Sequence, residues 1–385
     1  MIRYLTAGES HGKALIGIVE GIPAGVELKS DYINYQLWRR QQGYGRGGRM
    51  KIETDQVAIL SGVRFGKTIG SPIALMIQNK DWQNWTDRMA TDGDGAGIEK
   101  ITIPRPGHAD YAGAVKYGFD DIRNVIDRSS ARETAMRVAV CSVARKLLEE
   151  CGIVIGSHVL SIGAVAVKND KKFEALITAT ASSELANTAD TSEVRMLDKS
   201  AEKKAIEEIK NAKKAGDTLG GIFEIRVTGL PVGLGSYVHA DRRLSAQLSG
   251  ALMSIQAVKG VEVGDGFALA HMPGSEVHDE FILNGEKITR TTNHAGGLEG
   301  GMANGQTIVL HAAMKPISTL AHPLKSVNLA TKELVESRYE RSDVCAVPAA
   351  SIVGEAVIAP VLANALLEKF GGDSVKEIQE RYTGK

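Results

Sequence analysis

The chain has 385 residues, of which 43% are hydrophobic and 24% charged, enough for one large or two ordinary domains of a soluble globular protein. Lys and Arg together number 46, as do Asp and Glu, so no global charge favours nucleic acid or a membrane as partner, and any basic site must be local. Three cysteines without paired spacing, and no apolar run of signal-peptide length at the N-terminus, predict a reducing, cytoplasmic location.

The first third of the chain predicts paired strands around one helix. Residues 2–7 and 14–21 read as a strand pair. Residues 30–42 predict a helix with Ser30 as N-cap and Gly43 just past its end. The other predicted elements here are strands at residues 49–63 and 71–78 and a turn-rich loop at residues 81–97.

The remainder predicts long helices alternating with strands. Three of these helices are mostly apolar, at residues 129–152, 240–260 and 348–370, and one at residues 200–216 is amphipathic and exposed. The expected strands are residues 216–231 and 305–314. No linker or low-complexity segment divides the chain. The pattern favours a single α+β domain over residues 1–385 rather than a doubly wound sheet.

One apolar run, residues 346–367, approaches the length of a membrane span. It contains Glu355 and two prolines. A carboxylate at the centre of a bilayer costs roughly 2.5–3.5 kcal/mol. The run is therefore predicted to be a buried core helix, and no membrane is expected as a partner.

Two glycine motifs match known signatures but lack the required context. The string GESHG at residues 8–12 fits the G-x-S-x-G nucleophile elbow, yet only seven residues precede it and a strand-like segment follows. The string GYGRGG at residues 43–48 fits G-x-G-x-x-G, but it follows a predicted helix instead of a strand. Neither a serine nucleophile nor a dinucleotide site is predicted from them.

Arginines gather in the loops of this neutral chain. They are Arg39, Arg40, Arg46, Arg49, Arg105, Arg123, Arg128, Arg132, Arg338 and Arg341. A guanidinium presents a planar fork that suits carboxylate and phosphate, so the set predicts a pocket for a small polyanion. Two alternatives stay open, a hydrolase using Ser10 or Cys345 and a non-catalytic polyanion binder. His271 and His278 lack a completing ligand set, so no metal is predicted.

Ten motifs in order resemble the chorismate synthase family. They are GESHG, GYGRGGRMKIETD, RPGHAD, RSSARET, SEVR, GDTLGG, IQAVKGVEVG, NHAGGLEGGMANGQ, KPISTL and RSDVCAVPA, between residues 8 and 349. The resemblance implies a β-α-β sandwich with long central helices between antiparallel sheets, assembled as a homotetramer. It also implies conversion of 5-enolpyruvylshikimate 3-phosphate to chorismate by 1,4-elimination of phosphate, with reduced FMN required. Whether NADPH is the reductant stays open.

The resemblance also implies roles for individual residues. His11 is placed near the flavin as a proton donor, His108 near the leaving phosphate, and Asp343 at the proton of the flavin's nitrogen 5. The residues implied to bind the anionic groups of the substrate are Ser10, Arg49 and Arg132. The cofactor-binding set is Arg40, Arg46, Arg128, Ser129, Ser130, Gln256, Ala257, Gly300, Lys315, Pro316, Ile317, Ser318, Thr319 and Arg341, with Gln256 at a position that is often Asn in the family.

Overall fold

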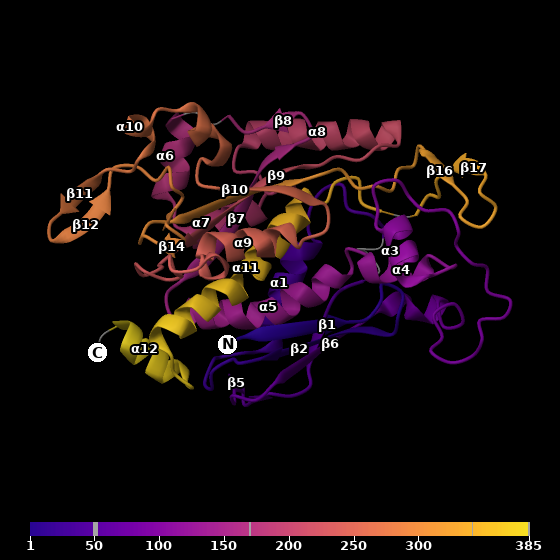
Figure 1. The fold of residues 1–385 in the computed structure, drawn as a ribbon, viewed down its shortest axis with the longest axis horizontal. Coiled ribbons are helices and arrows are strands. Elements are labelled where there is room, and N and C mark those ends of the chain that lie inside the picture. Colours follow the sequence, from indigo (N-terminus) through magenta and orange to yellow (C-terminus); the bar gives the residue numbers. More distant parts are fainter. Residues whose placement is uncertain (49–52, 169–170, 341, 384–385) are drawn as a thin grey trace.

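Two antiparallel sheets enclose a layer of helices (Figure 1). The computed structural model describes residues 1–48, 53–168, 171–340 and 342–383. The first sheet has the order β1-β2-β6-β3, made of β1 (Arg3–Ala7), β2 (Ala14–Glu20), β6 (Ile73–Gln78) and β3 (Val57–Ile59). The second has the order β10-β15-β9-β7-β8, made of β10 (Val258–Val263), β15 (Ile308–Met314), β9 (Gly221–Thr228), β7 (Val154–Ile162) and β8 (Val165–Ala166). Every neighbouring pair is antiparallel.

The layer between the sheets consists of long helices. They are α1 (Ser30–Gln41), α5 (Glu133–Glu150), α9 (Leu244–Met253) and α11 (Val347–Phe370). The inner side of β2 shows how closely they pack. A Cβ on Gly17 would lie 2.4 Å from a methyl carbon of Val140 in α5, so only glycine lets the helix approach the strand this far. The arrangement confirms the predicted α+β class with central helices between antiparallel sheets.

Helix α11 confirms the prediction of a buried core helix. Among the described residues it is the one helix long and apolar enough to cross a membrane by length and composition, but 83% of its apolar window is buried inside the molecule. Apolar residues occupy all of its sides, as expected for a helix surrounded by protein. Its N-terminal turn carries Pro348, a residue that suits the first turn of a helix.

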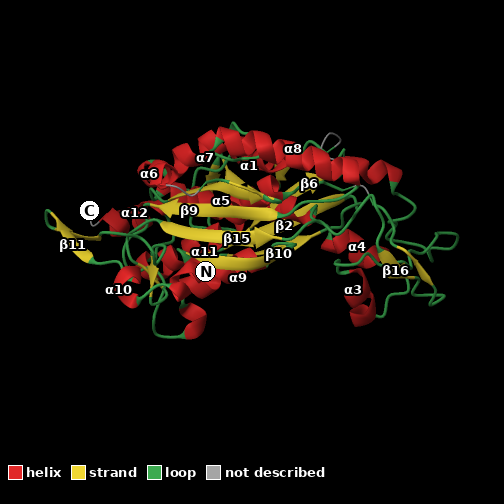
Figure 2. Cartoon of the chain, turned by 90° about the horizontal axis from the view of Figure 1, so that it is seen from above, coloured by secondary structure: helices red, strands yellow, loops and turns green. Residues whose placement is uncertain are grey.

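A further layer of helices covers the outer side of the second sheet (Figure 2). It is made of α6 (Lys171–Ala179), α7 (Ser182–Asp190) and α8 (Lys199–Ala215). The predicted amphipathic helix corresponds to α8. The carboxylate of Asp198 accepts hydrogen bonds from the first backbone N–H groups of α8, and Gly216 ends the helix with φ +71°.

Shorter elements lie toward the two ends of the long axis (Figures 1 and 2). One end holds α3 (Asp110–Tyr117), α4 (Arg123–Ser129) and the hairpin of β16 (Lys325–Val327) and β17 (Leu334–Glu336). The other holds α10 (Gly274–Val277) and the hairpin of β11 (Phe281–Asn284) and β12 (Lys287–Arg290). The remaining elements are β4 (Val63–Arg64), β5 (Lys67–Thr68), β13 (Leu298–Glu299), β14 (Met302–Ala303), α12 (Val375–Thr383) and 3-10 turns at Lys80–Asn84, Ala240–Arg242 and Gly266–His271.

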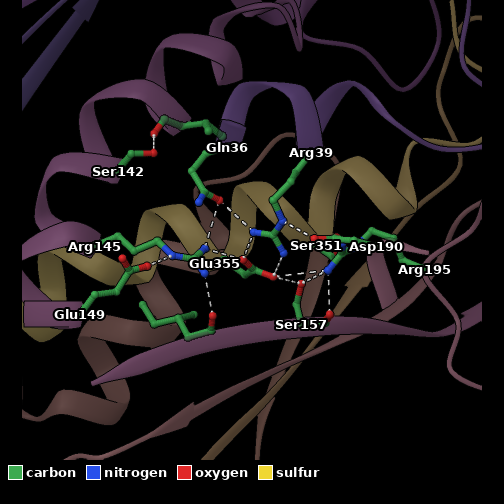
Figure 3. Close-up of polar contacts among 12 residues, drawn as sticks. Gln36, Arg39, Ser142, Arg145, Glu149, Ser157, Asp190, Arg195, Ser351 and Glu355 are labelled. Carbon is green, nitrogen blue, oxygen red and sulfur yellow. Dashed lines mark hydrogen bonds and ion pairs between the residues drawn. The ribbon is translucent and has the colours of Figure 1, made fainter. Parts of the chain in front are cut away.

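A buried ion cluster joins the central helices to the second sheet (Figure 3). Glu355 of α11 lies 2.6 Å from Arg39 of α1 and 2.5 Å from Arg145 of α5. It also accepts a hydrogen bond of 2.6 Å from Ser157 of β7, and Arg195 lies 3.4 Å away. Burial raises the pKa of Glu355, but the surrounding arginines outweigh that effect and hold the pKa well below its usual value.

Several of the predicted boundaries are wrong. The helix expected from residue 129 begins at Glu133, and the strand expected from residue 216 begins at Gly221. The buried helix expected at residues 240–260 ends at Met253, and Val258–Val263 is a strand. The segment contains three valines, which favour a strand, and Ala257 has φ +67°, a left-handed conformation that cannot continue a helix. Ser30 is the first helical residue and Lys29 the N-cap, without a side-chain cap. Of the strand expected at residues 49–63, described residues 57–59 form β3 and residues 49–52 lie outside the described part.

Candidate active site

Several loops meet beside α3 and α4, at one end of the long axis. Ser10 donates its backbone N–H to the carbonyl of Asp127 in α4, at 2.9 Å. Lys315 donates to the carbonyl of Gly107 at 3.0 Å. Residues 342–345 meet residues 43–48, since Gly45 accepts from the backbone N–H of Val344 at 2.8 Å. The structure thus brings together segments that are far apart in the chain, with Gly47 and Asp343 separated by 296 positions.

His11 lies between a carboxylate and an aromatic ring. Its Nδ1 is 2.6 Å from Oδ1 of Asp127, whose side chain is fully buried. Its imidazole stacks on the indole of Trp85 with centroids 3.9 Å apart. Arg123 lies near the same indole, 5.0 Å from its centroid. Because a carboxylate only accepts hydrogen bonds, Nδ1 of His11 carries the hydrogen of this contact.

His108 has a second buried aspartate as its partner. Its Nδ1 lies 2.5 Å from Oδ1 of Asp110, the first residue of α3. Arg105 grips the same carboxylate with Nε at 2.9 Å and Nη2 at 3.1 Å. Burial raises the pKa of Asp110, but hydrogen bonds from His108 and Arg105 outweigh it, so the pKa lies well below its ordinary value. Asp110 therefore stays ionised and fixes His108 in one orientation.

Arg40 and Arg132 form a buried cationic floor. Nη1 of Arg132 lies 2.5 Å from Asp55, and Nε donates to Asn79 at 3.0 Å. Nε of Arg40 donates to the hydroxyl of Thr134 at 2.9 Å, and its Nη1 is 3.8 Å from Asp55. Burial, aided by the neighbouring arginines, lowers the pKa of Arg40 to about 10. Arg132 also lies 3.6 Å from Glu53, so two carboxylates face the two guanidinium groups. Nη1 of Arg40 and Nη2 of Arg132 are buried donors without a hydrogen-bond partner within the described residues, and both can donate to an anionic ligand.

Asp343 and Arg46 form a third ion pair, 2.7 Å apart. The other carboxylate oxygen of Asp343 accepts the backbone N–H of Gly47 at 2.6 Å. The neighbouring Cys345 is fully buried, and burial raises the pKa of its thiol to about 12. A thiol of this kind is a poor nucleophile, which argues against the alternative of a cysteine hydrolase.

The segment RSS closes α4 beside the first strand. Arg128 donates to the carbonyls of Gly8 and Thr6, each at 2.9 Å. The hydroxyl of Ser129 donates to Val125 at 2.6 Å, within its own helix. The hydroxyl of Ser130 accepts the backbone N–H of Arg132 at 3.2 Å. These contacts fix the end of α4 close to the loop that carries His11.

The segment KPIST lies beside the loop that carries His108. Its first residue, Lys315, donates its backbone N–H to Ala257 at 2.9 Å, and burial together with Lys259 lowers the pKa of its side chain. Its last residue, Thr319, accepts from Arg105 at 3.1 Å. Between them, the carbonyl of Ile317 accepts from Thr218 at 2.6 Å. The same segment contains Pro316 and Ser318.

One predicted cofactor residue lies apart from the rest. Gly300, in the turn between β13 and β14, lines a pocket together with Val277 of α10 and Phe281 of β11. That pocket is at the end of the molecule opposite to α3 and α4 (Figure 1). Arg49 and Arg341 lie outside the described residues. Among the described residues, the structure therefore leaves Gly300 apart from the site residues that meet beside α3 and α4.

Comparisons with known proteins agree with one another. A family model described as chorismate synthase matches residues 2–367. The chain is similar to a chorismate synthase of Chlorobaculum tepidum, with 63% identity over 99% of this chain and 96% of that protein. The chain belongs to the chorismate synthase family. Another relative named chorismate synthase, from Chloroherpeton thalassium, is 58% identical over the full length of both chains.

A solved structure extends the likeness to the fold. The crystal structure of a chorismate synthase matches with a TM-score of 0.79 and 42% identity, covering 100% of this chain and 96% of that one. The predicted resemblance to the chorismate synthase family and the predicted fold class are therefore confirmed. The roles of single residues stay predictions.

The sequence motifs identified the two histidines but not the side chains that contact them. Asp110, Asp127, Asp55 and Trp85 were not predicted as site residues. Asp110 stands inside the motif RPGHAD and Asp127 directly precedes the motif RSSARET, so a carboxylate within two residues of a motif histidine or arginine was a usable signal. Trp85 lies in the turn-rich loop 81–97, and nothing in the sequence connects it to His11.

Proposed function

We propose that this member of the chorismate synthase family converts 5-enolpyruvylshikimate 3-phosphate to chorismate, by 1,4-elimination of phosphate with loss of a proton from carbon 6. The observation that carries the proposal is the pairing of His11 and His108 with buried aspartates beside a cluster of arginines. The substrate carries two carboxylates and a phosphate. Such a ligand is buried only against matched cations, and Arg132 would supply one from the floor of the site, beside Arg40, which the resemblance assigns to the cofactor.

The residues near Lys315 fit a reduced flavin. Oε1 of Gln256 is buried and has no hydrogen-bond partner within the described residues, while its Nε2 donates to Glu133 at 3.2 Å. An unsatisfied buried acceptor costs about 1–3 kcal/mol, and a reduced flavin ring offers N–H donors that would satisfy it. Burial and Lys259 lower the pKa of Lys315. Its amine would lie near the anionic flavin ring or the flavin phosphate.

Reduced FMN, when bound, would lend electron density to carbon–oxygen cleavage and take it back as the proton leaves, without net redox change. We assign its contacts to the predicted set around Arg128, Ser129, Ser130, Gln256, Ala257 and residues 315–319. The protein's own part is to bind the anions, orient the ring of the substrate and exclude water.

Three residues would handle protons. Because Nδ1 of His108 donates to Asp110, its Nε2 is the atom that exchanges a proton with the departing phosphate. Nε2 of His11 takes the same part on the flavin side, because Asp127 occupies its Nδ1. Asp343 is held by Arg46 and by the backbone N–H of Gly47. It would receive the proton that leaves carbon 6 of the substrate, on the side of the site where the flavin binds.

We further propose a homotetramer in the cytoplasm, with NADPH as a candidate source of electrons for FMN. The outer side of the first sheet supports the assembly. Leu5 pairs with Ile18 across β1 and β2, and their side chains are 77% and 46% exposed on the side away from the helices. Exposed apolar patches of this kind mark interfaces. The distant position of Gly300 is also explained if a second copy supplies it to the flavin site.

An anaerobic reaction tests the proposed function. The protein is mixed with chemically reduced FMN and 5-enolpyruvylshikimate 3-phosphate, and chorismate absorbance and phosphate release are followed together. We expect equal yields of both products, and neither with oxidised FMN. Flavin binding without products would contradict the substrate, and absence of flavin binding would leave the non-catalytic polyanion binder. A second reaction with NADPH and oxidised FMN decides whether the chain reduces its own flavin.

A further inference from the structure

His11 has two side-chain neighbours, Asp127 and Trp85, to which the resemblance assigns no role. Asp127 comes from α4 and Trp85 from the segment after the 3-10 turn Lys80–Asn84, so the histidine contacts two other parts of the chain. The contacts are of different kinds, a hydrogen bond to one ring nitrogen and a stack on the ring face. Together they restrict both rotations of the histidine side chain.

Asp127 determines which nitrogen of His11 carries a proton. Its Oδ1 lies 2.6 Å from Nδ1 and its side chain is fully buried, so water does not compete for this contact. Nε of Arg123 lies 4.0 Å from the second oxygen of the same carboxylate. A carboxylate accepts hydrogen bonds, so it selects the Nδ1–H tautomer of His11 and leaves Nε2 as the nitrogen for proton exchange.

Trp85 fixes the plane of the imidazole. The two rings stack at 3.9 Å with an interplanar angle of 30°. The indole is itself held in place, since its Nε1 donates to Asp81 at 3.1 Å. Asp81 is buried and follows β6 closely, so the tryptophan is anchored to the body of the first sheet.

We propose that Asp127 and Trp85 are positioning residues for His11, which fix its tautomer and ring plane so that Nε2 delivers the proton. The segment around Trp85 is then a fixed wall of the site and not a lid. The inference rests on the proposed function in one respect, because that function makes His11 a proton donor. The geometry of the ring itself is testable without any turnover.

The first test reads the tautomer by NMR. Protein labelled with ¹⁵N-histidine is measured at a pH where His11 is neutral, and the His11 signals are identified by their loss in His11→Gln. We expect the Nδ1–H tautomer in the wild type and its decline to a minority in Asp127→Asn, whose amide can donate to Nδ1. An Nε2–H tautomer in the wild type would overturn the inference even if the variant does not fold.

The second test separates positioning from binding by steady-state kinetics with reduced FMN. In Asp127→Asn we expect kcat to fall about 10–100-fold with KM within twofold, since the arginines that hold the substrate are unchanged. The pH profile of kcat should also change, because Asp127 contacts the ring whose other nitrogen exchanges the proton. Trp85→Ala should lose about tenfold in kcat, and Trp85→Phe, which keeps a stacking ring, should recover most of it.

Matched controls are present in the same chain. His239 and Asp241 form a pair of the same geometry, with Nδ1 2.6 Å from Oδ1, but on the surface. Asp241→Asn should leave kcat and its pH profile unchanged, as should Trp82→Phe, since no stack of Trp82 on a histidine is found among the described residues.

The outcomes distinguish the two proposals. Wild-type kcat and pH profile in both Asp127→Asn and Trp85→Ala, in an enzyme that makes chorismate, would overturn the positioning role and leave the function intact. A wild-type protein that makes no chorismate but shows the Nδ1–H tautomer, lost in Asp127→Asn, would contradict the function and support the geometry.

Discussion

Each proposed catalytic histidine has its Nδ1 against a buried carboxylate, although the two come from unrelated loops. His11 has Asp127 and His108 has Asp110, at 2.6 and 2.5 Å. A buried carboxylate partner selects one tautomer and fixes the orientation of the ring. Nε2 of each histidine is then available for proton exchange in a single orientation. The same contact on the surface, between His239 and Asp241, is open to water and has no such consequence.

The first prediction concerns the loss of these histidines. His108→Ala and His11→Ala should each lower turnover by about 10²–10⁴-fold, the usual effect of removing an acid–base group. Chorismate formation with chemically reduced FMN measures it, and His239→Ala serves as the surface control. Wild-type turnover in both variants would remove the two histidines from the mechanism.

Among the elements, α11 depends on charges that its apolar sequence conceals. Glu355 is its one buried carboxylate in the described part of the helix and neutralises arginines from α1, α5 and the segment before α8. Arg195 is also paired with Asp190. Burial and the neighbouring Arg39 lower the pKa of Arg195 to about 9, which shows how closely the guanidinium groups approach.

The second prediction follows from this cluster. Glu355→Gln should lower the free energy of unfolding by about 3–5 kcal/mol, because it leaves buried arginines without their counter-charge. Urea denaturation measures the change. In the exposed pair of Lys376 and Glu380, Glu380→Gln should have little effect. Equal stability of the two variants would contradict the importance given to the buried cluster.

A row of polar side chains crosses the second sheet at one register. His158 of β7, Glu224 of β9, His311 of β15 and Glu262 of β10 stand opposite one another. Glu224 lies 3.0 Å from His158 and 2.9 Å from His311. Burial lowers the pKa of His311, but the hydrogen bond and charge of Glu224 outweigh it, and the net pKa is raised.

The third prediction is the pH dependence that this row produces. A histidine with a raised pKa contributes stability fully below its unfolded value of about 6.5, and that contribution is lost as the pH rises through the folded value. The free energy of unfolding should therefore fall above pH ~6.5 in the wild type and less steeply in His311→Asn. Urea melts at a series of pH values check this, with His271→Asn as control. Parallel curves for wild type and His311→Asn would contradict it.

At the scale of the whole molecule, the first sheet presents apolar residues on both sides. The inner side packs on α5, and on the outer side Leu5, Ile18 and Leu60 are 77%, 46% and 57% exposed. An antiparallel sheet that faced only water there would carry polar residues. The two-sided pattern supports contact with another copy of the chain.

The fourth prediction is that charges on this side disrupt assembly. Leu5→Lys combined with Ile18→Lys should reduce the molar mass measured by light scattering coupled to size exclusion, with the secondary structure by circular dichroism unchanged. The matched control is Leu334→Lys, at an exposed position in the hairpin of β16 and β17. A tetrameric double variant would move the interface to another surface, and a monomeric wild type would contradict the homotetramer.

The sequence by itself determined the family, the fold class and most of the long elements. The family followed from ten motifs in the order of a known family. For the elements and the α+β class, local signals suffice, since periodicity and capping residues act within a few turns of chain. They placed α8 within a residue at each end and recognised α11 as a core helix. They failed at residues 258–263, where neighbouring β15 decides that the segment is a strand.

Only the tertiary structure decided how the site is assembled. It paired His11 with Asp127, stacked it on Trp85 and joined Arg132 to Asp55, contacts between residues 74 to 116 positions apart. Side-chain contacts of this kind depend on the packing of separate loops, for which a single sequence holds no local signal. It also placed Gly300, in the turn between β13 and β14, beside α10 and β11, at the end of the molecule opposite to α4. The motif residues could be predicted from the sequence, whereas their partners were identified only from the tertiary structure.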